Sequence, residues 1–193
     1  MQFYKKLFTF WFSVLIYDLT VEFCERFIKS WKLTEQMNGA ARSGKQNIVE
    51  GSEAMATSLK SGIKLTNVAK ASIEELIGDL EDFLRQRKLP QRPKTDPRVR
   101  RFRAQSARIV RNLSNLSTLR LPAEQADRKQ RQLLSQLPLP ADSEKAANFL
   151  LTLCHQATYL LDRQVKALEK KHEKEGGYTE KLYQRRLRAR RAS

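Results

Sequence analysis

The sequence predicts an all-α protein: an antiparallel four-helix bundle with a basic insertion between its third and fourth helices and a basic C-terminal arm. Glycine and proline number only 7 and 6 in 193 residues, so long stretches contain no helix breaker. Apolar residues recur every three or four positions in several segments, which is the helical period. No run alternates apolar and polar residues in the manner of a half-buried strand. Helices with one apolar face bury it against one another, and a bundle is the simplest arrangement that achieves this.

The first helix is predicted over about residues 4–29, because apolar side chains recur every four residues from Leu15 to Phe27. Its start, Leu7 to Tyr17, follows two lysines and resembles the beginning of a signal peptide. No small-residue cleavage pattern follows it, however, and acidic residues come next. The apolar run is also well short of the roughly 18 residues that span a bilayer. We therefore expect the front of a buried helix and no membrane role.

The second and third helices are predicted over about residues 34–50 and 58–88. Thr34 is a suitable N-cap for the second, and Gly51-Ser52 is expected to end it. Small residues from Gly39 to Gly44 would let a neighbouring helix approach closely. The third helix carries a continuous apolar stripe from Leu65 to Phe83, and prolines at 90 and 93 end it.

The fourth helix is predicted over about residues 143–174, with Asp142 or Ser143 as its cap and Gly176-Gly177 as its break. The insertion, residues 90–141, would hold a short basic helix within 96–120 and then a partly ordered connection from Leu121 to Pro140. Residues 1–175 thus form the predicted bundle, and residues 176–193 form an arm that is helical when bound and frayed when free.

The positive charge is concentrated in two segments. Between Arg85 and Arg111 the chain has eleven basic residues and one acid, and between Lys166 and Arg191 it has ten basic residues and four acids. These two segments account for the whole formal net charge of +16. Two basic segments on a neutral body indicate a polyanionic partner. The alternatives are solvated helix faces with a disordered tail, and an acidic membrane surface, which the lack of interleaved Trp or Phe disfavours.

The candidate nucleic-acid contacts are basic residues of the insertion, of the arm and, more weakly, of the second helix. They are Arg98, Arg100, Arg101, Arg103 and Arg108; Arg185, Arg186, Arg188, Arg190 and Arg191; and Arg42 and Lys45. Phe102 and Tyr183 could stack on bases, although a packing role is the commoner one for such residues.

No enzymatic motif is complete. Residues 39–46 fit the phosphate-binding pattern G-x-x-x-x-G-K, but Gln46 stands where a Ser or Thr would hold magnesium, and no strand precedes it. The two histidines, His155 and His172, lack partners with metal-ligand spacing. Cys24 and Cys154 lie among apolar neighbours, which predicts buried free thiols and a reduced, cytoplasmic setting. We expect a non-enzymatic protein without a metal or cofactor.

Residues 16–89 resemble the four-helix bundle protein family. This family includes proteins encoded in intervening sequences of bacterial large-subunit ribosomal RNA genes and the accessory variability protein of diversity-generating retroelements. The similar segments are Ile16–Cys24, Gln36–Met37, Ala40–Ile48, Glu50–Ser52, Lys64–Ala69, Glu74–Leu76 and Asp82–Arg85, and residues 155–162 resemble the fourth helix of its suffix-domain branch. Gly62, where a polar helix former is expected, and the arginine-rich residues 98–111 depart from the pattern.

The resemblance implies an antiparallel bundle that assembles as a ring-like pentamer with a basic surface. It also implies a non-catalytic accessory protein that binds RNA, and for retroelement relatives a reverse-transcriptase partner. With the charge pattern, it predicts binding of nucleic acid, RNA or DNA, through Lys and Arg contacts to phosphates. The alternative is a protein-interaction scaffold, such as an accessory subunit of a reverse transcriptase.

Overall fold

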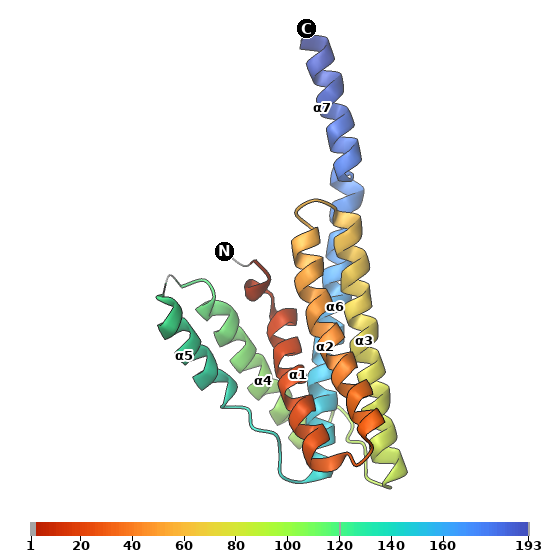
Figure 1. The fold of residues 1–193 in the computed structure, drawn as a ribbon, viewed down its shortest axis with the longest axis vertical. Coiled ribbons are helices and arrows are strands. Elements are labelled where there is room, and N and C mark those ends of the chain that lie inside the picture. The colour runs from red at the N-terminus through yellow and green to blue at the C-terminus, as the bar shows by residue number, and fades with distance from the viewer. Residues whose placement is uncertain (1–2, 120, 193) are drawn as a thin grey trace.

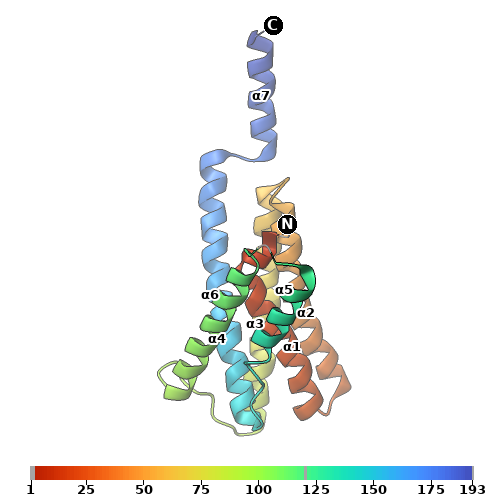
Figure 2. The ribbon, with the colours of Figure 1, turned by 90° about the vertical axis from the view of Figure 1, so that its left-hand side faces the viewer.

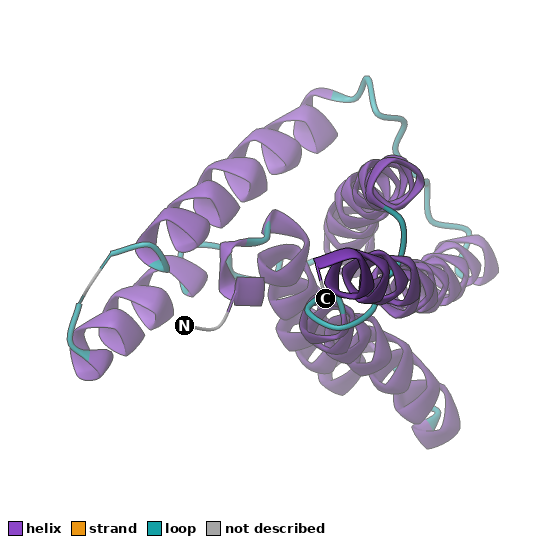
Figure 3. Ribbon diagram, turned by 90° about the horizontal axis from the view of Figure 1, so that it is seen from above, coloured by secondary structure: helices purple, strands orange, loops and turns teal. Residues whose placement is uncertain are grey.

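The computed structural model describes residues 3–119 and 121–192, and within them every regular element is a helix, joined by loops, and no strand is present (Figure 3). The prediction of an all-α protein is confirmed, but the number of helices is larger than predicted. A short 3-10 helix, η1, precedes seven α-helices. Their bounds are η1 (Phe3–Lys6), α1 (Phe8–Phe27), α2 (Trp31–Ala54), α3 (Leu59–Gln86), α4 (Pro97–Leu116), α5 (Ala123–Leu134), α6 (Ser143–Glu175) and α7 (Tyr178–Ala192).

Four helices pack most extensively against one another: α1, α2, α3 and α6. They lie side by side, and successive helices run in opposite directions (Figure 1). Each of them packs against two of the others, α1 against α2 and α6, and α3 against α2 and α6. Their apolar faces meet in one core whose largest fully buried side chains include Ile16, Phe23, Met37, Leu76 and Leu153. The burial of these faces is the main source of stability for this part of the chain.

Glycines allow α2 and α3 to approach closely. A Cβ atom on Gly44 would lie 2.9 Å from Cγ1 of Ile73, and one on Gly51 would lie 3.2 Å from Cβ of Leu65. A Cβ on Gly62 would meet the side chain of Met55 and lie 3.1 Å from the carbonyl oxygen of Gly51. Gly62 is therefore not an exposed position at which a polar side chain would be expected. It is buried at this helix contact, where α2 leaves no room for a side chain.

The second helix is longer than predicted at both ends. It begins at Trp31 rather than near Thr34, because the Ser30 hydroxyl accepts a hydrogen bond from the backbone N–H of Leu33 and caps it. It also continues through Gly51-Ser52 to Ala54. Both residues are buried, and Gly51 packs closely against Leu65 and Gly62 of α3; this tertiary contact outweighs the weak helix propensity of glycine. The first helix is shorter than predicted, since residues 3–6 form the separate η1.

The insertion is more ordered than predicted. It contains α4 as expected, but the segment predicted to be a partly ordered connection holds α5 and two anchoring leucines, Leu137 and Leu139, which are buried in the core. α5 has no buried residue and lies beside α4 (Figure 2). Few apolar residues and several prolines concealed this order in the sequence.

After the exposed Phe8, the start of α1 is buried from Thr9 to Ser13, and the Trp11 indole N–H donates to the carbonyl oxygen of Lys5 at 2.7 Å. None of the described helices is long and apolar enough to cross a bilayer. Both cysteines are buried free thiols, as predicted, and burial is the main reason that the pKa of Cys24 rises to about 12 and that of Cys154 is raised as well. These thiols are unreactive packing groups.

Candidate nucleic-acid interface

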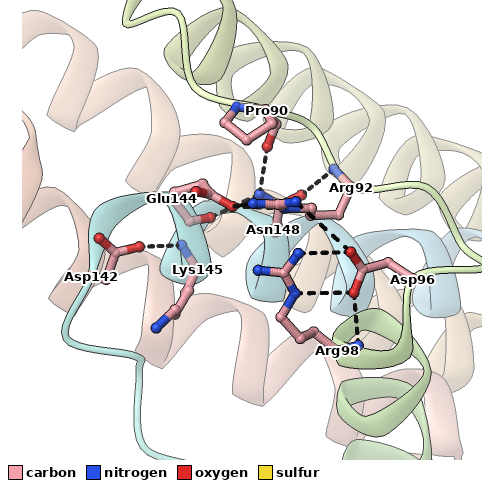
Figure 4. Close-up of polar contacts among 8 residues, drawn as sticks. All are labelled: Pro90, Arg92, Asp96, Arg98, Asp142, Glu144, Lys145 and Asn148. Carbon is pink, nitrogen blue, oxygen red and sulfur yellow. Dashed lines mark hydrogen bonds and ion pairs between the residues drawn. The ribbon is translucent and has the colours of Figure 1, made fainter.

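The start of α4 is held by an acidic cap. The Asp96 carboxylate accepts from the backbone N–H of Arg98 at 2.8 Å and from the Arg98 guanidinium at 3.1 and 2.9 Å (Figure 4). These hydrogen bonds are the main reason that the pKa of Asp96 falls from 3.8 to about 2. Because the folded pKa is the lower one, the interaction stabilises the fold above about pH 4 and is lost as the pH falls through 2. Arg98, although exposed, is thus engaged within the chain.

The loop that leads into α4 is tied to the first turns of α6. Asn148 is only 4% exposed. Its side-chain oxygen accepts a hydrogen bond from the backbone N–H of Arg92 at 2.7 Å. Its side-chain amide nitrogen donates to the carbonyl oxygens of Pro90 at 3.0 Å and Glu144 at 2.9 Å. The Arg92 guanidinium forms an ion pair with Glu144 at 2.6 Å (Figure 4). These contacts fix the direction in which the chain enters α4.

Replacing Asn148 with alanine is expected to destabilise the protein by about 2 kcal/mol, because the Arg92 N–H and the Pro90 and Glu144 carbonyls all lose the same buried partner. Urea unfolding measures the change, and hydrogen exchange should show faster exchange over residues 89–111. The neighbouring Gln91 is the control, since it is exposed and bonds only Glu81 at the surface, so Gln91→Ala should cost less than about 0.5 kcal/mol. Equal effects of the two changes would contradict the anchoring role.

The outward face of α4 is a row of unpaired arginines. The sequence of α4 contains six arginines and no acid, and its apolar side, including Val99, Ile109 and Leu113, is buried against the core. Arg98 is paired with Asp96. The side chains of the other five arginines are exposed, and none of them forms an ion pair or hydrogen bond with a residue that the structure describes. We call these five the α4 arginines: Arg100, Arg101, Arg103, Arg108 and Arg111. They comprise four of the predicted contacts and one further residue, Arg111.

The second predicted cluster lies on a separate helix. Gly176, with φ of 65°, ends α6 in a conformation that favours glycine, and α7 extends beyond the top of the other helices (Figures 1 and 2). Exposed side chains on α7 include four predicted contacts; these are Arg185, Arg186, Arg188 and Arg190. The side chain of Arg191 lies outside the described residues. The structure therefore separates the α4 arginines, which lie beside α1 and α6, from the arginines of α7.

The weaker candidates differ from each other. Arg42 is exposed on α2, whereas Lys45 is half-buried with its ammonium 3.9 Å from the centroid of the Tyr17 ring. Lys45 also lies close enough to Asp18 to oppose the rise in the pKa of that carboxyl that burial causes. Phe102 packs against Phe149, with ring centroids 4.8 Å apart, so it is a packing residue, while Tyr183 is exposed on α7. Lys45 and Phe102 thus have structural partners already.

One feature of the surface was not predicted from the sequence. A groove of about 840 Å³ runs between α4 and α6 over the start of α1, and we call it the α4 groove. Phe8, Phe12 and Leu151 contribute apolar surface to it, Arg103 and Arg111 line its α4 side, and Tyr159 lines its α6 side. Among the described residues none that lines it is acidic. The groove forms only when α4 docks beside α1, so no local pattern marks it.

Within the described part of the chain, no three His, Cys, Asp or Glu side chains gather in a way that could hold a metal ion. Comparisons with models of known protein families, with curated proteins and with solved structures find no match to this chain. The resemblance to the four-helix bundle protein family therefore stays a prediction.

Proposed function

We propose that the protein is a non-catalytic nucleic-acid-binding protein that contacts phosphates through the α4 arginines, assisted by the arginines of α7. The observation that supports it is that five exposed guanidinium groups share one acid-free helix and have no acidic partner among the described residues. A guanidinium recognises phosphate oxygens through two parallel hydrogen bonds. Because α4 is anchored through Asp96 and packed by its apolar face, these groups are presented on a rigid surface.

The family resemblance adds finer expectations to this proposal. α1, α2, α3 and α6 would be the antiparallel four-helix bundle, copies of which would assemble as a homo-oligomer, a pentamer in that family. RNA is the nucleic acid that the resemblance favours. The second candidate is a scaffold that binds an acidic protein or a reverse transcriptase through the same basic surface. Binding of nucleic acid by the purified protein alone distinguishes the two.

The test is a titration of the purified, nucleic-acid-free protein into labelled single-stranded RNA and duplex DNA across a salt series. If the α4 arginines alone displace counterions, the slope of log K against log salt should be at least about −3.5 for single strands and −4.5 for duplex DNA. Engagement of the arm would make both slopes steeper. Absence of binding at about 50 mM salt would contradict the proposal and favour the scaffold.

A further inference from the structure

We propose that the α4 groove takes unstacked bases of a single-stranded nucleic acid whose phosphates lie along the edge of α4. This inference rests on the proposed function and makes it more specific, because a duplex keeps its bases stacked and cannot supply them. Proteins that hold single strands combine a basic groove for the backbone with aromatic side chains on which bases stack. The α4 groove has both features.

The basic side of the groove is a straight line along α4. Arg103, Ala107 and Arg111 all line it and follow one another at intervals of four residues, so they share one edge of the helix. Arg103 and Arg111 are about 12 Å apart along the helix axis, at 1.5 Å per residue. The small side chain of Ala107 leaves the groove open between them. Lys94, in the loop before α4, also lines the groove, and no acid lines it among the described residues. The complementary partner is an extended polyanion parallel to α4.

Two aromatic rings in the groove have no role in the core. Phe8 is 44% exposed and Tyr159 is 60% exposed, and both line the groove together with Arg111. Below them Phe12, at 3% exposure, belongs to the buried core. The cation beside Tyr159 is Arg163, whose guanidinium lies 5.9 Å from the ring centroid and donates to the Tyr159 hydroxyl at 3.3 Å. Exposed aromatic rings provide stacking surfaces for bases of any sequence. They therefore fit bases better than they fit a partner that only needs apolar contact.

The wall formed by α6 contains no Lys, Arg, Asp or Glu among the residues that line the groove, and it is capable of hydrogen bonding. His155 is exposed there, and Gln156 connects the two walls: its side-chain oxygen accepts from the Ser106 hydroxyl at 2.8 Å, and its amide donates to the carbonyl oxygen of Arg103 at 3.2 Å. The second contact holds the backbone of Arg103 at a fixed distance from α6. The groove is thus open before a ligand arrives, and base edges would meet His155 while phosphates meet the arginines.

The experiment compares two 12-nucleotide probes with the same number of phosphates: an oligothymidylate and an oligonucleotide of abasic sites. We expect the full-length protein to bind the oligothymidylate about tenfold more tightly. In the double variant Phe8→Ala, Tyr159→Ala that preference should disappear, while affinity for the abasic probe stays unchanged. The control variant is Phe3→Ala, Trp31→Ala, which removes two aromatic rings that are exposed outside the groove and should keep the preference. Circular dichroism checks that each variant is folded.

A second measurement does not depend on any variant: photocrosslinking of an oligonucleotide that carries 5-bromouracil should attach the base to the α4 groove, at Phe8, Tyr159 or His155. Equal affinity for the two probes, or crosslinks only on α7, would overturn the groove assignment and leave the proposed function intact. Failure of every probe to bind would overturn both. Binding of an acidic amphipathic peptide that depends on Phe8 and Tyr159, without any preference for bases, would assign the groove to a protein partner instead.

Discussion

Replacing the five α4 arginines with glutamine is expected to weaken binding of single-stranded RNA and of duplex DNA about 1,000-fold at about 100 mM salt. Each surface contact between opposite charges contributes up to about 1 kcal/mol. Five contacts near 0.8 kcal/mol each give about 4 kcal/mol, which is a factor of about 1,000. The slope of log K against log salt should become shallower by about 0.7 for single-stranded RNA and about 0.9 for duplex DNA for each arginine removed. Fluorescence anisotropy over a salt series measures both quantities.

This variant should fold as the native protein does. The α4 arginines point away from the core, and the apolar residues that dock α4, including Val99 and Ile109, are unchanged. Glutamine has a helix propensity close to that of arginine, so α4 should remain helical. An unchanged melting temperature would show that the loss of binding comes from charge and not from loss of structure.

The matched control removes the same amount of charge elsewhere. Five exposed lysines outside α4 and α7 are replaced with glutamine; they are Lys29, Lys32, Lys60, Lys64 and Lys171. This protein has the same net charge as the arginine variant, and its affinity should stay within a few-fold of the native value, since none of the five lysines lies on α4 or α7 and salt weakens longer-range attraction. If the control loses as much affinity as the arginine variant, binding depends on net charge and has no specific site on α4.

The sequence predicted the helical class and the basic segments because both depend on local patterns. Apolar spacing places Leu76 and Leu80 on one face of α3 whatever surrounds them, and arginines on an acid-free amphipathic helix must lie largely on its exposed side. The start of α2 was misplaced because Ser30 and Thr34 are both acceptable caps, and only the geometry of the preceding turn selects Ser30.

The α4 groove and the pairing of Arg98 could not be read from the sequence for a different reason. In the sequence Arg98 resembles the other arginines of its segment. It differs from them in the structure because Asp96, at the start of the helix, binds its guanidinium. The groove combines Phe8 from the first turn of α1 with Tyr159 from α6, residues separated by most of the chain. Long-range packing of this kind leaves no periodic signal.

Replacing Gly44 with leucine is expected to destabilise the protein by about 3 kcal/mol or more, because no space exists for a side chain between α2 and α3. A Cβ atom there would already lie 2.9 Å from Cγ1 of the fully buried Ile73 and 3.6 Å from the carbonyl oxygen of Ala69. Overpacking of a well-filled core usually costs 1–3 kcal/mol, and here the helix backbones would also have to separate. Urea unfolding measures the cost as a lower midpoint with an unchanged slope.

Gly39, five residues earlier on the same helix, provides the opposite case. A Cβ atom on Gly39 would meet nothing within 4 Å, so Gly39→Ala should stabilise the protein by about 1 kcal/mol through helix propensity alone. The same helix should therefore tolerate a side chain at one glycine and reject it at the other. If Gly44→Leu unfolded at the native midpoint, the close contact between α2 and α3 at this position would be contradicted. A loss of stability at position 44 and a gain at position 39 would show that Gly44 is needed because α3 occupies the space beside it, and not because the helix needs flexibility there.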